Sequence, residues 1–116
     1  MFVVCNRISI NQGHEKEFED LFLSRDPRQA KHPITEQPGF IRNDLLRPTK
    51  EEPYVVLTYW NSREDFKAWT NSESFKEAHS GRSRQEIFAG RPNLEIHEVI
   101  RSVIGPGAGA ELTPTG

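Results

Sequence analysis

The stretch from Ser62 to His79 constrains the fold of this chain most, because it combines a helix start with a defined aromatic face. Ser62 is a typical N-cap residue, and Asp65 follows it at the position of a capping-box partner. Phe66 and Trp69 are spaced so that they share one face of the predicted helix. The stretch therefore predicts a helix that begins near Ser62 and presents two aromatic rings on one side.

The same stretch contains a break at Asn71-Ser72. Both residue types favour caps and turns, since their side chains compete for backbone hydrogen bonds. Phe75 and His79 follow at helical spacing and share a face of a second short helix. In one straight helix Trp69 and His79 would point about 80° apart, so the break is what allows both rings to enter one cavity. Core aromatics beside an unrelated histidine are the simpler interpretation of this stretch taken alone.

Residues Phe2 to Ile10 alternate in side-chain direction as in a β-strand. Asn6 stands among the apolar residues of the more hydrophobic face. An unpartnered buried amide costs about 1–3 kcal/mol. Asn6 therefore either bonds neighbouring backbone or lines a pocket and offers its N–H group to a ligand.

The remaining segments complete a β-α-β-β-α-β order. Periodicity and turn residues predict the following elements: a helix from His14, strands over Phe40–Arg47, Tyr54–Trp60 and Leu94–Val103, and a mobile loop over Ser80–Pro92. This order defines an α+β, ferredoxin-like fold with an antiparallel sheet. We expect residues 1–104 to form this domain and residues 105–116 to be a disordered tail.

Apolar residues occupy both faces of the predicted sheet. The helices cover only one face, and Val3, Cys5 and Val99 belong to the other. A second copy of the chain is the simplest cover, so we expect a homodimer with sheets packed face to face. Asn6 then lies beneath the helices that carry Trp69 and His79.

Composition narrows the partners and the compartment. The net charge of −2, without a basic run, argues against nucleic acid. No apolar run approaches the roughly 20 residues of a membrane span, so no membrane partner is expected. The single cysteine excludes an internal disulfide, which suits a reducing cytoplasm.

Three segments together resemble the IsdG/IsdI-type heme-degrading monooxygenases. Asn6 lies in C-N-R-I-S-I, Trp69 ends W-N-S-R-E-D-F-K-A-W, and His79 ends S-E-S-F-K-E-A-H. These enzymes belong to the antibiotic-biosynthesis-monooxygenase (ABM) superfamily of dimeric α+β barrels. The resemblance implies that Asn6, Trp69 and His79 are the catalytic set.

The resemblance also implies a role for each residue. His79 would be the axial ligand of the heme iron, with Phe75 and Phe66 packed against the porphyrin. Asn6 would donate a hydrogen bond to dioxygen at the iron, and Trp69 would force the macrocycle out of plane. Heme would be both cofactor and substrate, with dioxygen and an external electron donor, such as a reductase, completing the reaction and iron being released.

Two alternatives stay open at this point. A cofactor-independent monooxygenase of the same superfamily would act on a quinol or polyketide-type aromatic and would not need His79. A non-enzymatic heme-binding dimer would bind heme through His79 without opening the ring. The ring-opening product, biliverdin with CO or staphylobilin with formaldehyde, is not decided by the sequence.

Overall fold

Four antiparallel strands form one sheet in the order β2-β3-β1-β4. The computed structural model describes residues 1–24, 33–78 and 86–108. The elements follow one another as β1 (Phe2–Ile8), α1 (Glu15–Leu23), β2 (Phe40–Leu46), β3 (Tyr54–Trp60), α2 (Arg63–Thr70), α3 (Glu73–Ala78) and β4 (Asn93–Glu98), with single 3₁₀ turns at Ile34–Glu36 and Pro106–Ala108. The predicted α+β, ferredoxin-like fold is thus confirmed.

The central strand β1 fixes which side chains share a face. It pairs with β3 so that Phe2 lies opposite Trp60 and Ile8 opposite Tyr54. Phe2, Val4 and Ile8 are all buried, as the alternation predicts. Asn6 occupies the same face, because successive side chains of a strand point to opposite sides.

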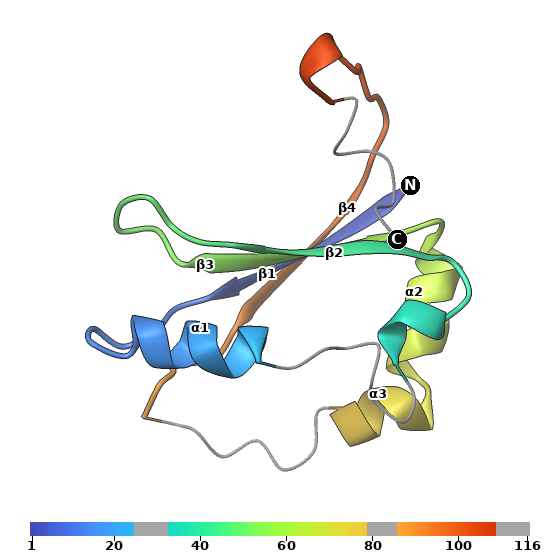
Figure 1. Ribbon diagram of the computed structural model, residues 1–116. Helices are drawn as coiled ribbons and strands as arrows, with labels where there is room; N and C mark the ends of the chain where they lie inside the picture. The colour runs from blue at the N-terminus through green and yellow to red at the C-terminus, as the bar shows by residue number, and fades with distance from the viewer. Residues whose placement is uncertain (25–32, 79–85, 109–116) are drawn as a thin grey trace.

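All three helices lie against this one face of the sheet, with α1 under one end and α2 with α3 under the other (Figure 1). The opposite face carries no described helix. It presents Val3, Cys5, Leu57 and Tyr59, each only partly buried. A chain segment after β4 runs away from the body of the molecule (Figure 1) and exposes 92% of Ile100 and 77% of Val103.

The tight turn before β2 brings Gly39 against the start of α2. Gly39 has a φ of +83°, and its carbonyl accepts a hydrogen bond of 2.8 Å from the Asn61 N–H group. A Cβ atom at this position would overlap the Asp65 carboxylate and lie 2.6 Å from the Asp65 Cβ. The turn therefore requires glycine both for its backbone conformation and for its contact with α2.

The structure corrects the sequence prediction in the segment before β4. Residues 80–85 lie outside the described part, but Ile87 has no exposed surface and Ile10 forms an isolated β-bridge with Phe88. The described end of the predicted mobile loop Ser80–Pro92 is therefore anchored in the core. Two apolar residues in a polar stretch show too little periodicity to reveal this anchor.

The end of the last strand also differs from the prediction. Strand β4 ends at Glu98 rather than Val103, because no described strand pairs with the residues beyond the hydrogen bond from Val99 to Met1. Pro106–Ala108, within the predicted disordered tail, form a 3₁₀ turn. Residues 109–116 lie outside the described part of the chain.

Candidate active site

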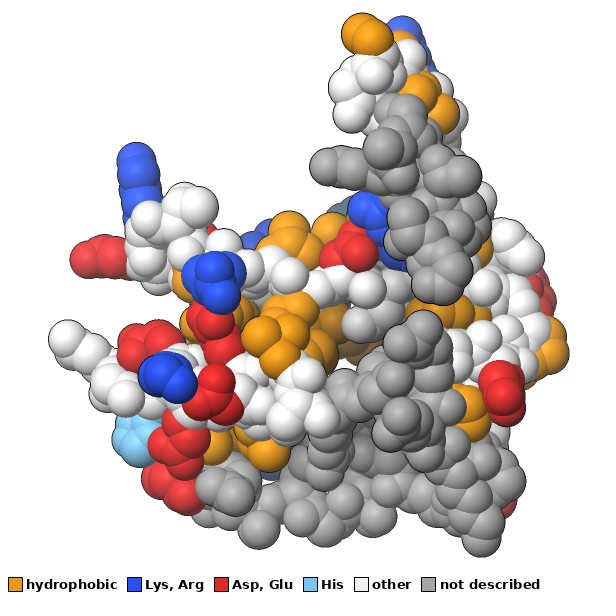
Figure 2. Space-filling model, viewed as in Figure 1, with side chains coloured by type: hydrophobic (Ala, Val, Ile, Leu, Met, Phe, Trp, Pro, Cys, Tyr) orange, Lys and Arg blue, Asp and Glu red, His pale blue; other side chains and the backbone are white. Residues whose placement is uncertain are grey.

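The helix-facing side of the sheet carries two separate hydrophobic clusters. The first lies under α2 and α3, and its buried members are Phe2, Val4, Trp60 and Trp69. The second lies under α1, and its buried members are Ile8, Phe18, Tyr54 and Ile87. Strands β1 and β3 contribute to both clusters. The two clusters are therefore separated at the middle of these strands, and this stretch between the clusters is called the interval. Hydrophobic side chains reach the surface beside α1 on the face shown in Figure 2.

Asn6 occupies this interval on β1, between Val4 of the first cluster and Ile8 of the second. Its Oδ1 atom is buried, and no group of the described residues donates a hydrogen bond to it. Among the described residues, no backbone N–H group therefore bonds this oxygen, as it would if Asn6 only stabilised the neighbouring backbone. A partly buried amide whose oxygen lacks a partner in the described part of the chain, beside apolar surface, is suited to contact a ligand.

Trp69 enters the first cluster from α2. Its side chain is 6% exposed and meets the Phe75 ring edge to face, with centroids 5.6 Å apart and an interplanar angle of 90°. The helix begins as predicted, because the Ser62 hydroxyl accepts a hydrogen bond of 3.2 Å from the Asp65 N–H group. The cap fixes the start of α2 and with it the depth at which Trp69 enters.

Ser72 creates the predicted break between α2 and α3. Its hydroxyl donates to the Trp69 carbonyl at 2.6 Å and accepts from the Phe75 N–H group at 3.1 Å. One side chain thus closes the end of α2 and caps the start of α3. This double role places Phe75 against Trp69.

Of the other predicted site residues, the structure describes the position of one and not of the other. Phe66 packs on Phe2 and Trp60, with centroids 5.9 and 6.2 Å apart, inside the first cluster. His79 lies outside the described residues, directly after the last residue of α3. The structure therefore brings Trp69 and Phe75 together and sets Asn6 on the same face, while the position of His79 is not described.

Sequence reasoning missed two polar residues on the same face. Asn43 of β2 donates from Nδ2 to Thr58 Oγ1 of β3 at 2.8 Å. Thr58 lies opposite Val4 in the register of β1 and β3. The available signal was the alternation of β3, which puts a hydroxyl between Val56 and Trp60 on an otherwise apolar face.

A charged network ties α1 to the β2–β3 end of the sheet. Arg47 donates to both carboxylate oxygens of Glu19, at 2.9 and 2.6 Å, and the Tyr54 hydroxyl donates to the same carboxylate. These hydrogen bonds, from Arg47 first and Tyr54 second, lower the pKa of Glu19 to about 2. Burial, followed by the Glu19 contact, raises the pKa of Tyr54 to about 12. Tyr54 therefore stays a neutral donor and α1 stays fixed beside the interval.

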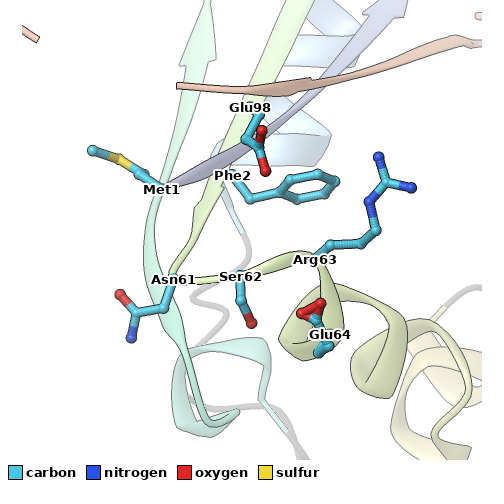
Figure 3. A pocket seen from close by; sticks show the side chains of 7 residues that line it. All are labelled: Met1, Phe2, Asn61, Ser62, Arg63, Glu64 and Glu98. Carbon is cyan, nitrogen blue, oxygen red and sulfur yellow. The ribbon is translucent and has the colours of Figure 1, made fainter. Parts of the chain in front are cut away.

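A pocket of about 210 Å³ opens elsewhere, at the start of α2. Phe2, Arg63, Glu64 and Glu98 line it, with the Arg63 guanidinium over the Phe2 ring at 5.4 Å (Figure 3). Phe2 stands four residues before Asn6 on β1, a separation of about 13 Å along a strand. This pocket is therefore distinct from the interval that holds Asn6. Within the described residues, no cluster of His, Cys, Asp and Glu is arranged to hold a metal ion.

The chain is thus a small α+β protein with a ferredoxin-like sheet, helices on one face of that sheet and a polar interval beneath them. The family model of antibiotic biosynthesis monooxygenases matches residues 1–81. The chain belongs to the antibiotic biosynthesis monooxygenase family.

Relatives of the chain include the heme oxygenase (mycobilin-producing) of two Mycobacterium tuberculosis strains. The chain is 40% identical to it over 67 residues, which cover 57% of this chain and 59% of that protein. The match therefore spans about three fifths of the curated relatives' length.

Solved structures extend the likeness over most of the chain. MhuD, a heme degrader from Mycobacterium tuberculosis with two hemes bound in its active site, is 36% identical with a TM-score of 0.71, covering 89% of this chain and 99% of that one. SnoaB, a cofactor-independent oxygenase from Streptomyces nogalater, is 20% identical with a TM-score of 0.62, covering 88% and 95%. The second likeness shows the shared fold alone.

Proposed function

We propose that this protein is a heme-degrading monooxygenase, which binds heme between the sheet and the helices and opens the porphyrin ring oxidatively, releasing iron. The observation that carries the proposal is the match to MhuD, whose structure holds heme and whose fold covers almost the whole of this chain. The buried Oδ1 atom of Asn6, unpaired among the described residues, and the adjacent aromatic cluster support a large, mostly apolar ligand at the same place. The alternative of a cofactor-independent oxygenase has only the shared fold in its favour.

Each proposed role uses a different property of the chain. Asn6 stands on the paired strand β1, which sets its side chain on the helix-covered face of the sheet, where its Nδ2 group is the donor toward the oxygen side of the ligand. Trp69, a buried member of the first cluster with Phe75 packed against its ring, presents a rigid indole that crowds the macrocycle. His79 follows α3 directly and supplies an imidazole, a usual axial ligand of heme iron. Heme, when bound, supplies the iron at which dioxygen is reduced and is itself the substrate.

The reaction needs dioxygen and electrons from outside the protein. We propose an external reductase as the electron donor. We also propose a cytoplasmic location, which the single cysteine supports. Among residues 1–24, 33–78 and 86–108, no helix has the length and apolar character to cross a membrane.

We propose further that two copies pair through the uncovered sheet face. That face presents the apolar side chains of Val3, Cys5, Leu57 and Tyr59, and Ile100, shortly after β4, is strongly exposed. A second copy would cover this apolar surface. A two-fold pair would bury the same patch on each chain. Sedimentation velocity tests this arrangement, and a monomer at micromolar concentration would contradict it.

A hemin titration of the apoprotein tests the function directly. The Soret band is followed during titration, and then during addition of ascorbate or a reductase system in air with catalase present. Saturable binding followed by Soret decay and release of iron is the expected result. Mass spectrometry of the product would separate biliverdin, staphylobilin and the mycobilin named for the relative.

Variants assign the roles in the same assay. His79→Ala is expected to abolish saturable binding, and Asn6→Ala is expected to bind hemin but to lose decay. His14→Ala is the matched control, because His14 is a histidine at the exposed start of α1 whose ring contacts Glu17. Binding without decay in the wild type would indicate a heme carrier. Absence of hemin binding would refute the proposed function.

A further inference from the structure

The missing partner of Asn6 Oδ1 is the starting point. The amide lies on the face that the helices cover, yet no described residue donates to its oxygen. An amide whose oxygen is unpaired is free to turn its oxygen or its nitrogen toward a ligand. If Asn6 is to act as a donor, something has to hold the oxygen away from the ligand.

Thr58 is the neighbour that can do this. Asn6 pairs with Val56 across β1 and β3, so Thr58 is its diagonal neighbour on the same face. Diagonal neighbours lie about 7–8 Å apart between Cα atoms and somewhat less between Cβ atoms. A hydroxyl and an amide at this separation meet through one shared water, or directly after a side-chain rotation.

Asn43 sets the direction of the Thr58 hydroxyl. Its Nδ2 group donates to Thr58 Oγ1 from the β2 side, at 2.8 Å. Strand β3 lies between β2 and β1. The Asn43 N–H group therefore reaches the Thr58 oxygen from the side away from Asn6. This leaves the hydroxyl hydrogen of Thr58 available to an acceptor on the β1 side. Asn43 is itself solvent-exposed, so the row runs from the surface to the partly buried side chain of Asn6.

We infer that Asn43, Thr58 and Asn6 form a directional hydrogen-bond row in which Thr58 is a positioning residue for the Asn6 amide. The row runs from Asn43 Nδ2–H to Thr58 Oγ1, and from the Thr58 O–H group to Asn6 Oδ1, directly or through one water. This leaves Asn6 Nδ2–H as the group that faces the ligand. The inference rests on the proposed function, because the ligand is the heme of that function.

The test compares Thr58→Val, Thr58→Ser and Asn6→Ala with the wild type. Valine has nearly the shape of threonine but no hydroxyl, whereas serine keeps the hydroxyl. Thr49→Val is the matched control, because Thr49 lies in the exposed β2–β3 turn and bonds Glu52. Urea unfolding of each apoprotein checks that folding is intact.

Carbon monoxide on the reduced heme complex is the spectroscopic probe. A hydrogen-bond donor beside the bound carbon monoxide lowers its C–O stretching frequency. Thr58→Val is expected to move this frequency toward that of Asn6→Ala, while Thr58→Ser and Thr49→Val keep the wild-type value. The hemin affinity of Thr58→Val should stay within about twofold of the wild type. Its Soret decay should slow about tenfold, less than the about 10²–10³-fold loss typical of a deleted donor.

The outcomes separate the inference from the proposed function. A wild type that does not bind hemin or does not degrade it refutes the proposed function. A wild type that degrades hemin, with a frequency that changes in Asn6→Ala but not in Thr58→Val, overturns the inference alone. A frequency that changes in neither variant also overturns it, because the Asn6 amide then does not face the ligand.

Discussion

Replacement of Gly39 by alanine should destabilise the protein far more than the same change at Gly13. Both glycines have a positive φ, +83° and +92°, so both substitutions strain the backbone. A Cβ on Gly13 meets nothing within 4 Å, whereas a Cβ on Gly39 would overlap the Asp65 carboxylate. The difference between the two variants therefore isolates the contact between the β2 turn and α2.

The expected loss of unfolding free energy in each variant is the sum of separate contributions. The left-handed conformation costs an L-residue about 1–2 kcal/mol, which applies at both sites. At Gly39 the Asp65 side chain must also move, which disturbs the Ser62 cap, and loss of such a cap costs about 1 kcal/mol. Alanine also reduces the conformational freedom of the unfolded chain, which offsets about 0.4–1 kcal/mol of this loss in both variants. We expect about 2–3 kcal/mol for Gly39→Ala, with steric repulsion included, and about 0–1.6 kcal/mol for Gly13→Ala.

Urea unfolding followed by circular dichroism measures both values, and tryptophan fluorescence reports Trp69 and its surroundings. At about 4–8 °C per kcal/mol for a domain near this size, Gly39→Ala should lower Tm by roughly 10–20 °C. Equal losses in the two variants would refute the reasoning, since they would show that the Asp65 contact contributes nothing.

Three further changes test other parts of the structure. Arg47 and Tyr54 hold the folded-state pKa of Glu19 at about 2, below the ordinary 4.5. The stability from this network is therefore present above pH 4.5 and lost as the pH falls toward 2. The urea midpoint of Glu19→Gln should vary less between these pH values than that of the wild type. Parallel curves of midpoint against pH for the two proteins would contradict the network. Ile87→Ala should cost about 2–5 kcal/mol by urea titration, whereas Ile100→Ala, at a site 92% exposed, should cost little, and equal costs would show that Ile87 is not a core residue. Trp69→Phe should retain hemin binding but slow Soret decay, and an unchanged decay rate would argue against crowding of the macrocycle by the indole.

Local signals in the sequence were sufficient for most of the fold. The Ser62 cap, the break at Asn71-Ser72 and the alternation of β1 each depend on residues close together in the chain, and the structure has all of them. The burial of Ile87 depends instead on contacts with residues of β1 and α1, far away in the chain. Such a contact leaves no periodic pattern in its own segment.

The candidate site divides in the same way. Strand alternation put Asn6 on the helix-covered face, and the structure adds that its oxygen is buried and unpaired among the described residues. The pairing of Asn43 with Thr58 depends on the register of β2 and β3, which shifts between Phe40 and Arg42. A register shift of this kind reverses which side chains share a face, and alternation alone does not reveal it.

The separation of the core into two clusters has a consequence for how the protein opens. Each cluster has its own helices, and strands β1 and β3 contribute to both clusters. Amide hydrogen exchange should therefore detect α1 opening while α2 remains protected, as two cooperative units of different stability. A ligand seated in the interval would touch both units and merge them, so that protection of α1 and α2 would rise together on binding.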